Sequence, residues 1–430
     1  MRITKRRALV ATAVVAATAA LSLTGCAQGG GSNSSSGGQL VLWTHNAGNK
    51  GELGAIETIV SDFNKSQSKY KVKVQAFPQD SYNQSVTAAA ASKKLPCILD
   101  IDGPNVPNWA WAGYLAPLTG LDATLSTFLP STVGKYNGQT YSYGFYDAAL
   151  AMISRKSTLT AAGIRIPTVD QPWTKAEFQD ALDKLKATGK FQYPADLSTG
   201  QTGEWWPYAY SPFLQSFGGD LINRDGYKTA DGVLNGSAAI DWAKWMRGLV
   251  SSGDIAAKSA ADPTADFING KTGILYDGNW VADGIRASLK DDAVFLPSVD
   301  LGHGAKVGGA SWQWGMSKTC NDQAGAEAYL KFASADKYVA LVSKATGNIP
   351  ATDAAAAQIP AYQPGGDDEI FREISKKSAV VRPVTPGYPF IATAFGTAAQ
   401  DIVNGADPKA TLDQAVKDID ANQKSNNYFK

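Results

Sequence analysis

The chain has 430 residues, with 44% hydrophobic and 18% charged residues and a formal net charge of +1. This length exceeds what one ordinary hydrophobic core supports, so it predicts a globular protein of two lobes or domains. The chain has two histidines, His45 and His303, and its three cysteines form no cluster with metal-ligand spacing. We therefore expect neither a zinc site nor another metal or cofactor.

The N-terminus has the pattern of a secretory signal. A basic segment at residues 2–7 precedes an apolar run at residues 8–23, and Cys26 follows Leu23-Thr24-Gly25. This order is typical of an export signal, and the Cys placed there resembles a bacterial lipobox. The resemblance implies that residues 1–25 are removed and that Cys26 is lipidated. The Gly-, Ser- and Asn-rich residues 26–38 then form a flexible tether.

The exported chain would be attached to the outer face of the cytoplasmic membrane, at the surface of a Gram-positive bacterium or in a periplasm. Without residues 1–25 it has 36 Lys and Arg against 39 Asp and Glu, a formal charge of −3. This balance argues against a nucleic-acid partner. No later run is long and apolar enough to span a membrane.

Strands and helices alternate in the first part of the body. Apolar patterns predict strands over 40–43, 71–77 and 97–102 and helices over 54–67 and 82–94. We expect Asp80 or Ser81 to cap the second helix. The β-α-β-α-β order predicts a parallel sheet with right-handed crossovers.

Polar residues follow these strands, where parallel sheets bind ligands. His45, Asn46 and Asp102 are the candidates for ligand contact. Residues 105–118 predict a short helix, and we expect its Trp111 to be in the core. Trp109 could face either way.

Three extended segments predict crossings between the two lobes. They span residues 140–156, 308–319 and 346–350. Three crossings make each lobe discontinuous in sequence and allow the lobes to move as hinged bodies. The cleft between two such lobes is a favoured site for a small molecule.

The second half predicts helices and one exposed strand end. Thr174 to Glu177 is a capping box that starts a helix, and we expect further helices over 321–334 and 407–421. Trp205 and Trp206 lie in a loop, so at least one should be buried or used. A strand over 273–280 ends in Asn279 and Trp280.

An ordered set of segments resembles the extracellular solute-binding proteins of bacterial ABC sugar importers, the class built like maltose-binding protein. These segments are ILDIDGPNVPNWAWAGYLAPL, FLQSFGGDLIN, FINGKTGILYDGNW, GGASWQWGMSK, TGNIPA and RPVTPGYP. The resemblance implies an α/β, two-lobe periplasmic-binding-protein fold of type II. One lobe would hold residues 39–145 and 316–347, the other residues 146–315 and 348–430. It also implies a monomeric, non-catalytic protein that captures a sugar and delivers it to permease subunits driven by a cytoplasmic ATPase.

The resemblance places the ligand-binding residues around the cleft. Its cleft positions fall at His45, Asn46, Asp102, Tyr146, Asp147, Trp205, Trp280, Trp312, Trp314 and Arg382. The loop and strand-end patterns add Trp206 and Asn279. Trp offers a rigid apolar face to sugar C–H groups, and carboxylates and Arg bind hydroxyls strongly. Because few Lys or Arg lie at these points, a neutral sugar, a di- or oligosaccharide, fits better than an anionic one.

The resemblance also implies a disulfide. The family commonly has Asp where this chain has Cys97. In that fold the strand after the second crossing lies antiparallel to the third strand, so its end meets the start of 97–102. We expect a Cys97–Cys320 disulfide, with two buried free thiols as the alternative.

Two other functions remain as alternatives. Asp100 and Asp102 are close carboxylates, which a lipid-anchored glycoside hydrolase would need. We expect the two to point to opposite faces of their strand and so not to flank one bond. A binding protein that serves a sugar sensor is the other alternative, and the sequence does not separate it from an importer.

Overall fold

The structure is a computed structural model that describes residues 39–309 and 311–429. The expected signal, the lipidation site Cys26 and the tether lie outside these residues. Two main sheets organise the described part, and helices pack against both. We call each sheet with its helices a lobe. None of the described helices combines the length and apolarity needed to cross a membrane.

The first lobe is built on a sheet with the strand order β2-β1-β3-β13-β6-β5. β1, β2 and β3 are parallel, and β13 runs antiparallel to β3, as expected. The strands are β1 (Gln39–Thr44), β2 (Lys71–Ala76), β3 (Ile98–Asp102), β13 (Trp312–Ser317), β6 (Gln139–Tyr143) and β5 (Val133–Tyr136). Side chains alternate between the two faces of β3, and each face contributes to a different apolar core.

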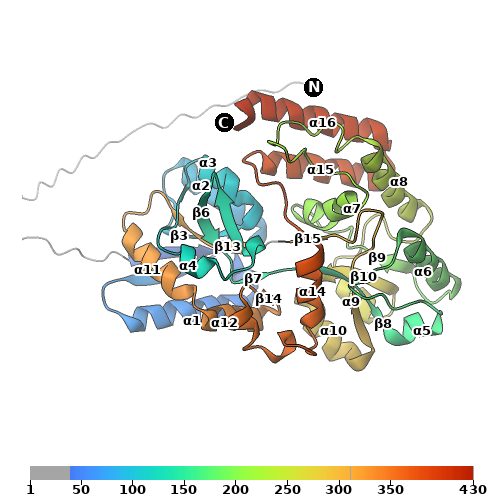
Figure 1. The fold of residues 1–430 in the computed structure, drawn as a ribbon, viewed down its shortest axis with the longest axis horizontal. Coiled ribbons are helices and arrows are strands. Elements are labelled where there is room, and N and C mark those ends of the chain that lie inside the picture. The colour runs from blue at the N-terminus through green and yellow to red at the C-terminus, as the bar shows by residue number, and fades with distance from the viewer. Residues whose placement is uncertain (1–38, 310, 430) are drawn as a thin grey trace, which may run out of the picture. The chain divides into compact units, whose positions relative to one another are not determined.

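Helices cover both faces of this sheet. Figure 1 shows α1 (Lys50–Ser66) and α12 (Asp336–Thr346) on one side and α2 (Gln79–Ala91) and α3 (Val106–Trp111) on the other. The expected caps of α2 are wrong. The helix begins two residues before Ser81, and Pro78 stands at its N-cap without a side-chain bond. Asp80 lies instead in the first turn, where its charge favours the helix dipole.

The second lobe is built on a smaller sheet with the order β11-β8-β10-β9. Its strands are β11 (Ala293–Leu296), β8 (Leu150–Arg155), β10 (Thr272–Gly278) and β9 (Tyr193–Asp196). The expected capping box is present at the start of α6 (Lys175–Ala187). In Figure 1, α8 (Ser237–Ser251), α15 (Tyr388–Val403) and α16 (Pro408–Ser425) pack together at the top of this lobe.

The three expected crossings are confirmed. The chain leaves the first sheet after β6, forms β7 (Tyr146–Asp147) and enters the second sheet as β8. It returns from β12 (Val307–Gly308) into β13, and β14 (Ile349–Pro350) pairs antiparallel with β7. The lobe boundaries at residues 146, 316 and 348 stay a prediction.

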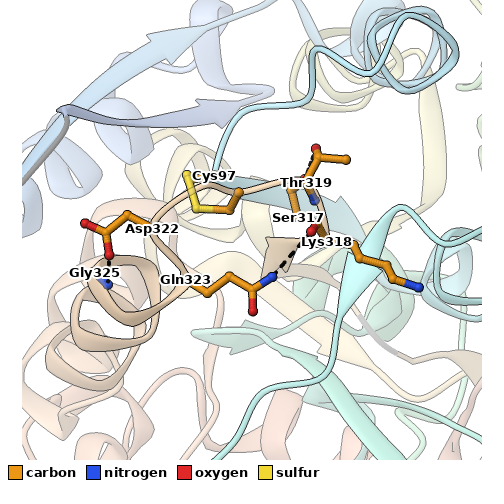
Figure 2. Close-up of a disulfide and its surroundings, with 8 residues drawn as sticks. Cys97, Ser317, Lys318, Thr319, Asp322, Gln323 and Gly325 are labelled. Atoms are coloured by element: carbon orange, nitrogen blue, oxygen red, sulfur yellow. Dashed lines mark hydrogen bonds between the residues drawn. A yellow bond between two sulfur atoms is a disulfide. The ribbon is translucent and has the colours of Figure 1, made fainter.

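The Cys97–Cys320 disulfide is present. It joins the residue before β3 to the turn after β13, and the backbone N–H of Ser317 also donates to the carbonyl of Cys97 at 2.9 Å. Figure 2 shows how this turn leads into α11 (Gln323–Ala333), where Asp322 caps the helix through the N–H of Gly325. The bridge and the β3–β13 pairing therefore hold the same end of the first sheet.

The expectation that Trp111 is in the core is wrong. The Trp111 residue is 43% exposed, and its ring meets Phe429 edge to face at 5.1 Å. Trp109, which could have faced either way, is buried. On a six-residue helix, the two tryptophans two positions apart point to different sides, so only one reaches the core.

Candidate functional site

The carboxyl ends of β1 and β3 bring three polar residues together. Asp100 Oδ2 accepts hydrogen bonds from the Thr44 hydroxyl at 2.8 Å and from His45 Nδ1 at 2.6 Å. All three side chains are buried. Burial alone would lower the pKa of His45, but the charge and hydrogen bond of Asp100 raise it above its ordinary value. The carboxylate of Asp100 thus favours the protonated form of the imidazole.

A second buried carboxyl ties α1 to the first crossing. Glu52 Oε1 accepts a hydrogen bond from the Tyr146 hydroxyl at 2.8 Å, and Glu52 Oε2 accepts one from Asn49 at 3.2 Å. Burial raises the pKa of Glu52, and the charge of His45 partly opposes this. Asn46 completes the cluster by donating to the Thr44 hydroxyl at 2.8 Å. The polar residues that follow β1 are therefore bonded mainly to one another.

A charged chain of residues links the two lobes. Arg382, from the segment after β15 (Ala379–Val380), donates to Glu204 Oε1 at 2.6 Å, and its Nη2 lies 4.0 Å from Asp102 Oδ1. The Tyr388 hydroxyl also donates to Glu204 Oε1. Asp102 belongs to the first sheet, and the other three belong to the second lobe. One guanidinium thus stands between two carboxylates from opposite sides.

Burial shifts the pKa of both carboxyls. It raises the pKa of Glu204 to about 7, although Arg382 opposes the shift. Burial also raises the pKa of Asp102, against the charges of Arg382 and His45. Arg382 is shared by these two carboxyls, so an anionic ligand would compete with both of them for the guanidinium.

An aromatic wall stands next to this chain in the second lobe. Trp280 is 38% exposed, and its ring lies 6.4 Å from that of Trp205 and 6.3 Å from that of Tyr208. The guanidinium of Arg382 lies 5.0 Å above the ring of Tyr208. The wall therefore adjoins the Asp102–Arg382–Glu204 chain and exposes part of one indole.

Several predicted residues have structural partners in the described part. Trp312 stacks on the His45 ring at 3.6 Å, and Trp314 is 3% exposed in the core of the first lobe. Trp206 is buried, and its indole N–H donates to the carbonyl of Gln201. Their assignment to ligand binding stays a prediction, and Trp206 and Trp314 lie beneath the surface that the other residues form.

Asp147 lies in the first crossing, and Asn279 bonds to the first and third crossings from the end of β10. Asp147 Oδ2 accepts from Ser131 at 2.8 Å and from Ser375 at 2.9 Å. The Asn279 side chain accepts from the N–H of Ala149 and donates to the carbonyl of Gly347. The Asn279 contacts connect the first and third crossings, whereas Asp147 ties the first crossing to Ser131 and Ser375.

Three residues of the site escaped prediction. Glu204 is in the same loop as Trp205, but it forms its ion pair with a residue 178 positions away. Tyr208 lies in the π-helical turn η4 (Trp206–Tyr210), and Tyr388 begins α15. The Gly-Glu-Trp-Trp loop was a signal for Glu204, whereas nothing in the local sequence marks Tyr208 or Tyr388.

The expectation that Asp100 and Asp102 point to opposite faces is wrong. Successive side chains of a strand alternate, so residues two positions apart share a face. Their proximity is evident because the charge of Asp100 raises the pKa of Asp102. What argues against a hydrolytic pair is that Asp100 is already bonded to Thr44 and His45.

The arrangement offers an apolar face and charged hydrogen-bonding groups side by side. Within residues 39–309 and 311–429, no group of three or more His, Cys, Asp and Glu side chains could hold a metal ion. Such a surface can bind a ligand with apolar C–H faces and hydroxyl groups.

Comparisons with known proteins agree with this architecture. A model of the bacterial extracellular solute-binding protein family matches residues 58–369. The chain is 24% identical over 336 residues to the diacetylchitobiose binding protein DasA of Streptomyces coelicolor, which covers 75% of this chain and 76% of the relative. It is 23% identical over 416 residues to the sn-glycerol-3-phosphate-binding periplasmic protein UgpB of Rhizobium meliloti, over 88% and 92% of the two chains.

A solved structure shows the fold. The cyclic alpha-maltosyl-1,6-maltose binding protein from Arthrobacter globiformis superimposes with a TM-score of 0.74 at 23% identity, over 90% of this chain and 99% of the other. This likeness confirms the expected two-lobe periplasmic-binding-protein fold of type II.

Proposed function

This chain belongs to the bacterial extracellular solute-binding protein family, and from that premise we propose that it captures a neutral sugar between its two lobes and delivers it to an ABC importer. The ligand is a di- or oligosaccharide. The importer consists of permease subunits driven by a cytoplasmic ATPase. The protein acts as a monomer without catalysis, and the lipid on Cys26 anchors it to the outer face of the membrane.

One observation supports this proposal most directly. The partly exposed Trp280 has its ring 6.3 Å from that of Tyr208, and the Tyr208 ring is covered by Arg382, which pairs with Asp102 from the other lobe. A sugar needs both an apolar platform and charge-assisted hydrogen bonds. Closure around it would bury these groups together, and the affinity would include the cost of closing.

The charge of the site favours a neutral sugar. Arg382 is already paired with Asp102 and Glu204, so a phosphate would have to compete with two carboxyls for it. This separates the proposed ligand from the one in the name of UgpB, and agrees with the sugars in the names of DasA and the Arthrobacter protein.

A ligand screen tests the proposal. The chain from residue 39 onward would be titrated with neutral mono-, di- and oligosaccharides, followed by tryptophan emission and thermal unfolding. A binder raises the unfolding temperature by mass action and perturbs the emission of Trp280. A bound sugar recovered intact supports capture, whereas cleavage products would favour the hydrolase. No response to any neutral sugar would reject this ligand class.

Two substitutions test the site. We expect Trp280→Ala to weaken sugar binding about 30-fold, from the ~2 kcal/mol typical of an aromatic anchor. Asp102→Ala should weaken it as well, because hydroxyl groups lose a charged acceptor. Both variants should keep the unfolding temperature near that of the wild type. Unchanged dissociation constants in both, measured by isothermal titration, would remove this site.

A further inference from the structure

We propose that Gly278 and Asp277 are positioning residues that hold the Trp280 indole in the orientation on which the sugar stacks. The inference rests on the proposed function, because it explains how the exposed aromatic ring of that site is fixed. The residues concerned lie at the end of β10. They are the buried carboxyl of Asp277, Gly278 with no side chain, and the indole of Trp280.

The missing side chain at Gly278 makes room for the ring. A Cβ built there would lie 2.2 Å from the Cη2 and Cζ3 atoms of Trp280, far inside van der Waals contact. The backbone itself does not require glycine, because φ is −93° and ψ is 169°, an extended conformation open to any residue. The indole therefore lies against the bare backbone at the end of the strand.

The carboxyl of Asp277 holds the backbone against which the same ring lies. Asp277 is 8% exposed, its Oδ1 accepts from the N–H of Gly278 at 2.7 Å, and its Oδ2 accepts from the hydroxyl of Thr264 at 3.3 Å. These two bonds fix the strand end at Gly278, and so they fix the surface on which the indole rests.

Aromatic neighbours restrict the remaining directions. The ring planes of Trp205 and Trp280 form an angle of 76°, and those of Tyr208 and Trp280 form an angle of 35°. The backbone of Gly278 beneath the ring and the two rings beside it leave the indole little freedom, yet the residue keeps 38% of its surface exposed. A platform already fixed in this way loses little rotational freedom when a ligand stacks on it.

Two variants disturb the ring by independent routes. Gly278→Ala displaces the indole without removing a hydrogen bond, and its extended backbone tolerates alanine. Asp277→Asn keeps the shape of the side chain but replaces one acceptor oxygen with an NH2 group, so that a single oxygen remains to accept from Gly278 and Thr264. Thr264→Val is the matched control, because it removes one hydrogen bond to Asp277 and leaves the contacts of Trp280 in place.

The mature chain and its variants would be titrated with maltose and with diacetylchitobiose by calorimetry. We expect Gly278→Ala and Asp277→Asn each to weaken the binding of the bound sugar about tenfold, and Thr264→Val to change it less than twofold. In a Trp280→Ala background, Gly278→Ala should have no further effect. An equal tenfold loss in that background would overturn the inference, since the glycine would then act without the indole.

Near-ultraviolet circular dichroism without ligand gives a second measurement. The contribution of Trp280 is the difference between the wild type and Trp280→Ala, and we expect Gly278→Ala and Asp277→Asn to lose it while staying folded. Spectra and affinities like those of the wild type would overturn the inference. If the wild type binds neither sugar, the proposed function fails for these disaccharides, and the spectra alone decide whether the two residues position the ring.

Discussion

The two halves of the site differ in how their polar groups are used. In the first lobe, Thr44, His45 and Asp100 bond to one another. Among the described residues, Asn46 Oδ1 and Asp100 Oδ1 of the first lobe and the Tyr208 hydroxyl and Arg382 Nε of the second are buried without a hydrogen-bond partner. Buried polar groups normally find partners. Both halves therefore keep hydrogen-bonding capacity, but the first is a hydrogen-bonded frame, whereas the second adds a partly exposed indole.

The largest effect should come from breaking the frame. Asp100→Ala would leave the His45 ring N–H and the Thr44 hydroxyl buried without their acceptor, and losing one partner of a buried pair costs about 3–5 kcal/mol. We expect urea unfolding to show a loss of this size. The affinity of the folded fraction for sugar should change less than in Trp280→Ala. A variant that stays stable and loses binding instead would make Asp100 a ligand contact and break the comparison.

The disulfide tests the same comparison between the two halves of the site, because it lies in the first lobe, away from the second half. Replacing Cys97 and Cys320 by serine together should lower the free energy of unfolding by about 2–4 kcal/mol, as removal of a native bridge does. The dissociation constant for sugar should stay within twofold. Intact mass under reducing and non-reducing conditions first establishes the bridge in the wild type. Two free thiols in that measurement would remove the premise.

Local patterns were enough to predict the first half of the molecule. The parallel order of β1, β2 and β3 follows from alternating strands and helices, and the crossings follow from the extended segments at residues 140–156, 308–319 and 346–350. The disulfide needed more, because only the family's fold says that the strand after the second crossing lies beside β3. Polar residues at strand ends were predicted too, although the pattern could not show that they bond to each other.

The second half depends on contacts that no local pattern contains. Arg382 and Glu204 are 178 residues apart, and the second and third crossings lie between them in the chain. Trp205 and Trp206 are adjacent, and which one is buried depends on the π-helical turn that follows. Trp111 was wrongly assigned to the core. Its ring partner, Phe429, lies at the other end of the chain, so no local pattern could show this contact.

The smallest effect should be a change in the pH dependence of stability. The pKa of Glu204 is raised from 4.5 to about 7 by burial, so the folded state binds this proton more tightly than the unfolded state. The resulting stabilisation is fully present below pH 4.5 and is lost as the pH rises through about 7. Glu204→Gln cannot ionise, and its side-chain oxygen can still accept from Arg382. We therefore expect its unfolding temperature, relative to the wild type, to be higher at pH 8 than at pH 5.

Glu177→Gln is the control for this measurement. The bond from Arg165 lowers the pKa of Glu177 to about 2, so this carboxyl stays ionised from pH 5 to 8 and its removal should shift stability equally at both values. If Glu204→Gln followed the wild type in parallel across this range, the carboxyl would be ionised throughout and Arg382 would be fully neutralised at all working pH values. A difference that changes with pH would instead show that Glu204, in the second half of the site, titrates near neutrality.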